Sequence, residues 1–182
     1  MHNDISEILF TEKQLADRVG EIGAAITSDY ADVADEGIIL ISVLRGAAIF
    51  MADLARKIEL PLEMDYMAIS SYGNGAKSSG VVQITRDLQS DITNRDIIVV
   101  EDILDSGNTL AFLKAYLMTK GARSVTIVTL LDKPSRREKA IHADYAGFVV
   151  PAEFVVGYGL DYAQPYRNMP YIGVLKPEVY SK

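Results

Sequence analysis

The stretch "VVEDILDSGNTL", residues 99–110, decides the fold, because a strand, a polar turn and a helix meet in it. The apolar run 96–100 predicts a buried strand, and the segment 109–122 has the apolar spacing of a helix. Small polar residues, Ser106 to Thr109, lie at the helix N-terminus, where unpaired backbone N–H groups and the helix dipole favour an anion. A strand, an anion-binding turn and a helix in this order indicate one unit of a parallel α/β fold.

The same stretch carries three carboxylates, Glu101, Asp102 and Asp105, which would repel an anion by themselves. Carboxylates at a strand end suit the hydroxyl groups of a ribose or a hard cation such as Mg²⁺. A sugar phosphate satisfies both halves, so the stretch predicts a ribose-5-phosphate site. Its predicted residues are Glu101, Asp102, Asp105, Ser106, Gly107, Asn108 and Thr109. A plain helix cap is the alternative for the polar turn, since Asp, Ser, Asn and Thr are common caps.

Upstream of this stretch, the sequence predicts a helix, a strand and a helix. Thr11 and Gln14 have the spacing of a capping box at the start of a helix over 11–26. The run 37–44 is apolar at successive positions, as strands buried on both faces of a parallel sheet tend to be. A second helix is predicted for 47–58. The core residues expected from the first helix are Leu15, Val19, Ile22 and Ile26.

Downstream, further strands complete the pattern. Gly121 is the predicted C-cap of the helix over 109–122, whose buried stripe is Leu110, Leu113 and Leu117. The other predicted strands are 63–75, 80–88, 124–131, 143–150 and 154–160. Strands alternating with helices predict an α/β fold with a mostly parallel twisted sheet flanked by helices, in a single domain over residues 1–182.

Polar residues follow three of the predicted strands at their carboxyl ends. Arg45 and Gly46 follow the strand 37–44, the acidic stretch follows a second strand, and Asp132 with Lys133 follows a third. In open parallel sheets, ligands bind at the edge where the strands end. We therefore expect these residues to line one site.

The composition argues against several other classes of protein. The chain has 182 residues, no cysteine and a net charge of −7, which speaks against broad binding to nucleic acid and indicates no disulfide framework. No run reaches the ~20 apolar residues that span a bilayer, and the N-terminus has no secretory signal, so a cytoplasmic protein without membrane or nucleic-acid partners is expected. His2 and His142 have no partners at metal or triad spacing. The charged segment 133–139 is expected to be a solvated turn or a subunit contact.

Several segments together resemble the type I phosphoribosyltransferases, in the form found in the hypoxanthine–guanine phosphoribosyltransferase branch. The stretch 99–110 is similar to the family's phosphoribosyl-pyrophosphate motif, and "VLRG" (43–46) is similar to its pyrophosphate loop. "SSYGNGAKSSG" (70–80) resembles its flexible lid. "LLDKPSRR" (130–137) and "FVVGYGLDYAQPYRN" (154–168) resemble its purine and metal segments. These segments occur in the family's order, and the resemblance extends over most of the chain.

The resemblance implies an enzyme of purine salvage. The family transfers a 5-phosphoribosyl group from phosphoribosyl pyrophosphate to N9 of a 6-oxopurine. The expected bases are hypoxanthine and guanine, with xanthine as a further candidate, and the products are IMP or GMP and pyrophosphate. The resemblance also implies Mg²⁺ as cofactor, a small hood beside the sheet, a flexible lid loop, and assembly as a homodimer or homotetramer.

The same resemblance assigns roles near the purine. Asp105 corresponds to the catalytic acid or base near N7, and Lys133 corresponds to the donor that binds the 6-oxo group. Phe154 corresponds to the ring that stacks on the base, Val155 lines the same plane, and Asp161 belongs to the purine and metal segment. A solvated turn is the alternative for Lys133, and a plain core strand is the alternative for Phe154 and Val155.

The remaining roles concern pyrophosphate, metal and lid. Arg45, Gly46 and Arg167 correspond to the pyrophosphate-binding residues, although many relatives have lysine in place of Arg45. The lid loop would carry Ser71 and Tyr72. The residues that would hold Mg²⁺ are Glu101, Asp102 and Asp161.

Two other functions remain open from the sequence. A regulator that senses phosphoribosyl pyrophosphate and binds RNA or DNA would keep the fold, although the negative charge and the retention of Asp105, Lys133 and Asp161 weigh against it. A transferase for adenine or a pyrimidine disagrees with Lys133, because an ammonium group favours a 6-oxo acceptor over a 6-amino donor. Binding to nucleic acid in low salt and turnover with adenine are the observations that separate these alternatives.

Overall fold

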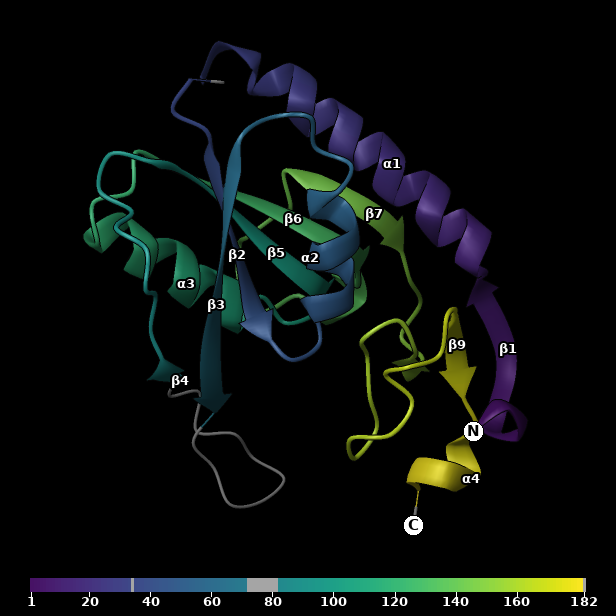
Figure 1. The fold of residues 1–182 in the computed structure, drawn as a ribbon. Coiled ribbons are helices and arrows are strands. Elements are labelled where there is room, and N and C mark those ends of the chain that lie inside the picture. The colour runs from purple at the N-terminus through teal and green to yellow at the C-terminus, as the bar shows by residue number, and fades with distance from the viewer. Residues whose placement is uncertain (34, 72–81, 182) are drawn as a thin grey trace.

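A six-stranded sheet and a three-stranded sheet make up the described part of the chain, in a computed structural model that covers residues 1–33, 35–71 and 82–181 (Figure 1). Helices cover both faces of the larger sheet, and the smaller sheet lies to one side, where the two chain ends meet. Of the helices in these ranges, none is long and apolar enough to cross a membrane. The predicted α/β fold, a mostly parallel sheet flanked by helices, is confirmed.

The larger sheet has the strand order β4-β3-β2-β5-β6-β7 within the described ranges. Its strands are β2 (Ile38–Leu44), β3 (Leu62–Ser71), β4 (Val82–Arg86), β5 (Asp96–Leu104), β6 (Ser124–Asp132) and β7 (Tyr145–Val149). All neighbours run parallel except β4, which is antiparallel to β3. The direction of the strand order reverses between β2 and β5. Such a reversal opens a crevice for ligands at the carboxyl ends of the two strands.

Helices α1 (Glu12–Asp29) and α2 (Ala48–Ala55) cover one face of this sheet, and α3 (Asn108–Thr119) covers the other. The hydroxyl of Thr11 accepts a hydrogen bond from the backbone N–H of Gln14, in the predicted capping box at the start of α1. Each predicted helix is therefore present, with ends that differ by a few residues.

Strand β2 shows why the run 37–44 predicts a strand buried on both faces. Ile38 and Leu40 pack into the core beneath α1 and α2, whereas Ile39 and Ile41 pack into the core beneath α3. Side chains alternate along a strand, so an uninterrupted apolar run needs a layer of helices on each face. The predicted core residues of α1 and α3 are buried as well: Leu15, Val19, Ile22, Ile26, Leu110, Leu113 and Leu117.

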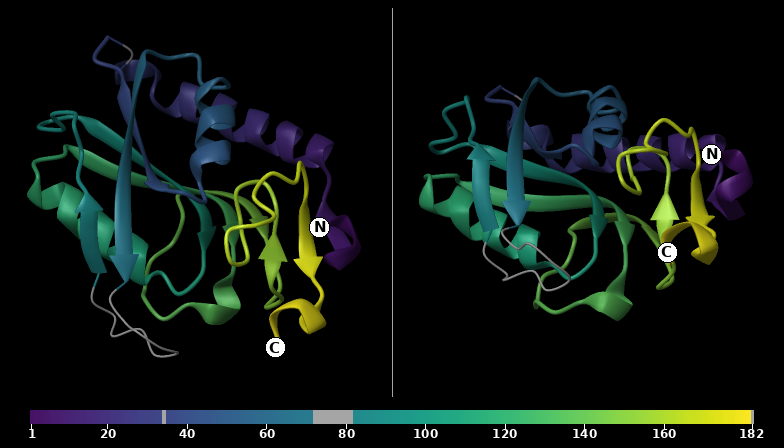
Figure 2. Two further views of the ribbon diagram at one scale, coloured as in Figure 1. Left: turned by 60° about the horizontal axis from the view of Figure 1, so that its bottom comes forward. Right: turned by 90° about the horizontal axis from the view of Figure 1, so that it is seen from below.

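The smaller sheet, here called the hood, is antiparallel and has the order β1-β9-β8. Its strands are β1 (Ile5–Phe10), β8 (Val155–Val156) and β9 (Ile172–Leu175), and helix α4 (Pro177–Tyr180) follows β9 (Figure 2). Short 3₁₀ helices occupy His2–Asp4, Ala31–Val33 and Pro134–Arg136. The hood agrees with the one implied by the resemblance, but β1 and β9 were not predicted as strands, because each is short and pairs with the opposite end of the chain.

The predicted strand over 154–160 is wrong beyond Val156. Gly157, Tyr158 and Gly159 have positive φ angles of 102°, 49° and 103°, which no extended strand adopts. The chain therefore turns sharply here and returns through an irregular segment to β9. That segment carries Arg167, one of the three residues expected at the pyrophosphate, and Asp161.

The predicted lid falls mostly outside the described residues. Ser71 is the last residue of β3, whereas Tyr72 and the loop through residue 80 lie outside the described ranges. The lid therefore stays a prediction.

Candidate active site

Glu101 and Asp102 lie within β5 rather than after it, which corrects the strand end predicted at residue 100. The strand continues because its parallel pairing with β6 continues, with Glu101 opposite Thr129 and Leu104 opposite Asp132. The two acids are thus held by the sheet itself, at the carboxyl end of a central strand. This is the edge on which the sequence predicted the site.

The protein compensates the charge of Asp102 in part and leaves that of Glu101 without a hydrogen-bond donor among the described residues. The Oε2 atom of Glu101 is shielded from solvent and has no hydrogen-bond partner among the described residues. Burial, and after it the neighbouring charge of Asp102, raises the pKa of Glu101 well above its usual range. Burial also raises the pKa of Asp102 to about 6, although a hydrogen bond from the Ile103 N–H and the charge of Arg167 pull it down. A ligand that brings hydroxyl groups or a cation would satisfy this pair.

Gly46 brings the loop after β2 against Asp102. A Cβ atom added to Gly46 would lie 1.7 Å from Oδ2 of Asp102, and one added to Gly159 would lie 2.0 Å from the carbonyl oxygen of Gly46. The loop after β2 therefore contacts the Asp102 carboxylate of β5 on one side and the backbone of the segment after β8 on the other. The peptide bond between Leu44 and Arg45 is cis.

Arg167 joins the same group of residues from the segment between β8 and β9. Its Nη1 donates to the carbonyl oxygen of Gly159 at 2.7 Å, and its Nη2 forms an ion pair with Oδ1 of Asp161 at 2.6 Å. Its Nε is shielded and has no partner in the described part of the chain. Nearby, Nη1 of Arg45 donates to Gln164 Oε1 at 3.0 Å. The structure thus brings together all three residues predicted at the pyrophosphate.

The polar turn before α3 is arranged as an open helix N-terminus. Gly107 is the N-cap residue, with a φ angle of 84°, and it makes no side-chain capping hydrogen bond with any described residue. The backbone N–H of Asn108 donates to Ser106 Oγ at 3.4 Å, and the side-chain amide of Asn108 donates to the same oxygen at 3.2 Å. A cavity of about 80 Å³ opens on this turn, and Glu101 and Thr109 are among its lining residues. The helix N-terminus therefore opens on a cavity next to the acids, and its binding of a phosphate stays a prediction. Because the Ser106 hydroxyl accepts from one N–H of the turn, the helix cap stays the alternative.

Asp105 stands between this turn and the segment after β6. Its side chain is 38% exposed, and its Oδ1 lies 3.3 Å from Nε of Arg136. The same Oδ1 accepts no hydrogen bond from the described residues. The carboxylate is thus available for proton transfer to a molecule bound above the turn.

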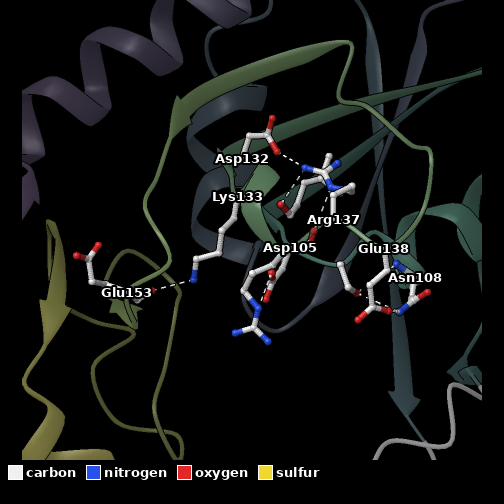
Figure 3. A network of polar contacts seen from close by, with 10 residues as sticks. Asp105, Asn108, Asp132, Lys133, Arg137, Glu138 and Glu153 are labelled. Carbon is white, nitrogen blue, oxygen red and sulfur yellow. Dashed lines mark hydrogen bonds and ion pairs between the residues drawn. The ribbon is translucent and has the colours of Figure 1, made fainter.

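Lys133 is buried, 5% exposed, so the solvated turn is wrong for this residue. Its ammonium group donates to the carbonyl oxygen of Glu153 at 2.8 Å (Figure 3). Burial lowers its pKa, while the charge of Asp105 opposes that change. A buried ammonium group near the Asp105 carboxylate is suited to bind an exocyclic oxygen of a ligand.

Phe154 and Val155 occupy different environments. Val155 is buried at 7% exposure in the hood, whereas Phe154 is 37% exposed. The ring of Phe154 stacks on that of Tyr180 with centroids 5.1 Å apart, and it meets the edge of Tyr162 at 5.7 Å. The exposure of Phe154 fits a stacking surface better than a plain core strand, and Val155 fits either interpretation.

Arg137 was missed by sequence reasoning. The segment 133–139 was expected to be solvated, but the Arg137 side chain is 14% exposed and lies between the ends of β5 and β6 (Figure 3). It donates to backbone carbonyl groups on both sides and pairs with Asp132. A run of charges in a sequence carries no sign that one of them is buried against carbonyl groups from another segment.

The residues present fit Mg²⁺ as part of a shared site. In the described ranges, no three His, Cys, Asp or Glu side chains are grouped so as to hold a metal ion by themselves. Mg²⁺ is commonly bound by one or two carboxylates together with water and substrate phosphates. The unsatisfied Oε2 of Glu101 and the neighbouring Asp102 supply such a pair. Asp161 is engaged by Arg167, so its role at a metal stays a prediction.

Two larger cavities lie elsewhere in the described part of the chain. One of about 420 Å³ lies between α1, α2 and the segment before β9, and another of about 560 Å³ lies along α3. Neither includes the acids of β5 or the open turn in its lining. We therefore place the site at the carboxyl ends of β2, β5 and β6.

Comparisons with known proteins show which family this chain is similar to. A family model described as "Phosphoribosyl transferase domain" matches residues 7–163. The hypoxanthine-guanine phosphoribosyltransferase of Bacillus subtilis is 53% identical over 99% of this chain and 98% of its own length. A crystal structure of a hypoxanthine phosphoribosyltransferase from Staphylococcus aureus has a TM-score of 0.95, with 48% identity over 100% of this chain and 97% of that one.

Other relatives are longer. The bifunctional protein TilS/HprT of Listeria innocua is 52% identical over all of this chain. The chain spans 28% of the length of that relative.

Proposed function

Since this chain belongs to the phosphoribosyl transferase family, we propose that it transfers a 5-phosphoribosyl group from phosphoribosyl pyrophosphate to N9 of hypoxanthine or guanine. The products are IMP or GMP and pyrophosphate, and the reaction serves purine salvage. One observation carries the proposal. Glu101, whose Oε2 has no partner among the described residues, and its neighbour Asp102 lie beside an open helix N-terminus, an arrangement that suits a molecule with both ribose hydroxyls and a phosphate.

The sugar is held at both ends in this proposal. The amides of the turn from Ser106 to Thr109 bind the 5-phosphate, and Glu101 with Asp102 faces the ribose hydroxyls. As the bond from C1 of the sugar to the pyrophosphate oxygen breaks, positive charge develops on the ring, as in glycoside hydrolysis. Carboxylates fixed beside the ring stabilise that charge without rearranging.

The leaving pyrophosphate requires positive charge. Arg45, Gly46 and Arg167 are the residues proposed to bind it, through the shielded guanidinium of Arg167 and the backbone of the loop after β2. Glu101, Asp102 and Asp161 are the residues proposed to hold Mg²⁺, which supplies positive charge to the pyrophosphate oxygens when it is bound. The electron pair of the broken bond leaves with the pyrophosphate.

The purine is activated as it attacks. Lys133 donates to its 6-oxo group, releasing the carbonyl of Glu153, and Phe154 with Val155 lines its plane. The lone pair of N9 forms the new bond to C1, and Asp105 accepts the proton that the purine gives up at N7. A 6-amino group would present hydrogens to the buried ammonium of Lys133, so adenine is a poor substrate.

The test is product formation from phosphoribosyl pyrophosphate and Mg²⁺ with hypoxanthine, guanine, xanthine and adenine in parallel. We expect turnover of the 6-oxopurines and none with adenine. Absence of turnover with every base, in a chain that still binds ribose 5-phosphate, would refute the transferase and leave the regulator. No observation on the described residues favours that regulator or an adenine transferase. Cytoplasmic location and a homodimer or homotetramer stay predictions.

A further inference from the structure

The guanidinium of Arg137 makes four contacts with groups that frame the turn (Figure 3). Its Nε donates to the carbonyl oxygen of Asp105 at 3.1 Å, and its Nη2 donates to that of Leu104 at 3.4 Å. On the other side, Nη1 donates to the carbonyl oxygen of Ile141 at 2.7 Å, and Nη2 pairs with the Asp132 carboxylate. The planar fork of arginine matches several fixed acceptors at once, which a lysine cannot do.

These contacts, together with the N–H of Lys133, which donates to the carbonyl oxygen of Leu104 at 3.0 Å, set the direction of the amides in the turn. A trans peptide is planar, so its C=O and N–H groups point in opposite directions. The cis bond among the described residues is Leu44–Arg45, so the peptides after Leu104 and Asp105 are trans. When Arg137 holds these two carbonyl oxygens on one side, the N–H groups of Asp105 and Ser106 face the other side, toward the cavity.

The residues after Arg137 continue the same arrangement. The carbonyl oxygen of Ser106 accepts from the N–H of Glu138 at 2.9 Å and from that of Lys139 at 3.2 Å. The side-chain amide of Asn108 donates to Glu138 Oε2 at 2.7 Å. Three successive peptides of the turn are therefore bound from one segment, and the next N–H in line, that of Gly107, is oriented in the same way.

Gly107 packs closely against the segment that follows β6. A Cβ atom on Gly107 would lie 2.6 Å from Cγ2 of Ile141 and 3.3 Å from Cδ of Arg137. The turn thus rests directly on the segment that orients it. The open helix N-terminus is formed in the protein before any ligand arrives, which reduces the ordering that binding would otherwise require.

We propose that Arg137 is a positioning residue, which presets the phosphate-binding amides and the backbone of Asp105 for the sugar phosphate. This inference rests on the proposed function, since it takes the turn to be the 5-phosphate site. Arg137 touches no reacting atom in this account. Its loss weakens binding of the sugar phosphate and leaves recognition of the purine by Lys133 and Phe154 in place.

The test compares Arg137→Met with a matched control, Arg18→Met. Arg18 also donates to two backbone carbonyls, those of Gly147 at 3.0 Å and Ala146 at 2.8 Å, but on β7 away from the turn. Calorimetric titration with ribose 5-phosphate gives the dissociation constant without turnover. We expect a roughly 10- to 100-fold weaker Kd in Arg137→Met and a change within about twofold in Arg18→Met.

Steady-state kinetics separate positioning from a general loss of structure. In Arg137→Met, the KM for phosphoribosyl pyrophosphate rises with the Kd, while the KM for hypoxanthine stays within about threefold of wild type. Arg137→Lys restores only part of the binding, because one ammonium group cannot reach both carbonyl groups. A folded Arg137→Met variant with wild-type Kd, or an equal loss in Arg18→Met, would overturn the proposal.

A second variant covers the case in which Arg137→Met fails to fold. Asp132→Asn keeps the arginine and its carbonyl contacts but removes the charge that holds the guanidinium, so the Kd weakens by roughly threefold. An unchanged Kd in Asp132→Asn overturns the proposal. Wild-type binding of ribose 5-phosphate without turnover of any base refutes the proposed function alone, because the Kd comparison does not depend on turnover.

Discussion

Strand β5 carries Asp96 at its start and the neighbours Glu101 and Asp102 toward its end, and Asp96 and Glu101 are surrounded in opposite ways. At its start, Asp96 is 7% exposed and accepts from Nε of Arg123 at 3.1 Å and from Nη2 at 2.6 Å. Ser124 Oγ donates to it as well, at 2.6 Å. At the other end, Glu101 has a shielded oxygen without a partner among the described residues.

The pKa shifts of the two acids have opposite signs for this reason. The hydrogen bonds from Arg123, helped by Ser124, lower the pKa of Asp96. Burial raises the pKa of Glu101, with no compensating donor. An ionised carboxylate therefore stabilises the folded state at the start of β5, where it is hydrogen-bonded. At the end of the strand, where it lacks a donor, it destabilises the folded state. Buried polar groups are normally hydrogen-bonded, so an exception at a ligand-binding edge indicates that a ligand completes the site.

The sharpest contrast concerns activity. Asp105→Ala should lower kcat by roughly 10²–10⁴, because the purine then has no positioned group to accept its proton. Its free energy of unfolding should change by about 0.5 kcal/mol or less, since the side chain is 38% exposed. Steady-state kinetics and urea denaturation on the same preparation check both. Near wild-type kcat would remove Asp105 from the mechanism.

The opposite pattern is expected at the start of the strand. Asp96→Ala should lower the free energy of unfolding by about 2 kcal/mol, because Arg123 and Ser124 lose their shared buried acceptor, although Arg123 keeps its ion pair with Glu36. The KM and kcat of the folded fraction should stay at wild-type values. Asp17→Ala is the control, since Asp17 pairs with Lys13 in an exposed ion pair and should cost less than about 1 kcal/mol. Equal losses in the two variants would contradict the comparison.

Removing charge at the end of the strand should stabilise the protein. Glu101→Gln should raise the free energy of unfolding of the ligand-free chain by about 1 kcal/mol at pH 8, because the buried charge is gone. The same variant should bind phosphoribosyl pyrophosphate more weakly, as expected where function and stability compete. Denaturation in the presence of a chelator measures the first effect. A destabilised variant would mean that an internal partner satisfies Glu101.

The last contrast between the two ends of β5 is a difference in the pH dependence of stability. In the folded chain, Asp102 has a pKa raised to about 6, so the native state binds its proton more tightly than the unfolded state. Stability from this group is therefore present at low pH and falls as pH rises from about 4 to about 6. Asp96 has a lowered pKa, so its stability is present above its ordinary value and is lost as pH falls.

Metal-free denaturation across pH 3–8 tests both signs. Asp102→Asn should reduce the fall in stability between about pH 4 and pH 6, and Asp96→Asn should reduce the loss of stability at acid pH. The two variants thus alter opposite limbs of one curve. If both variants changed the stability over the same pH range, the opposite pKa shifts of Asp102 and Asp96 would be contradicted.

Local sequence patterns predicted some parts of the fold and of the site but not others. The main sheet was predictable because runs such as 37–44 are apolar on both faces, and the residues at the strand ends were predicted from the same pattern. The residue at which β5 ends was not predicted from the sequence, because it depends on how far the strand pairs with β6. The burial of Arg137 depends on carbonyl groups of Leu104 and Asp105, which no local pattern shows. The hood strands pair opposite ends of the chain, so their register has no local signature.

The central claim is that the end of β5 is completed by a ligand and its start is not. The most direct measurement is thermal and urea denaturation with and without phosphoribosyl pyrophosphate and Mg²⁺ at about 100 times the Kd. Wild type and Asp96→Asn should each gain about 2.7 kcal/mol from the ligands, and Glu101→Gln should gain far less. A full gain in Glu101→Gln, or its loss in Asp96→Asn, would contradict the account.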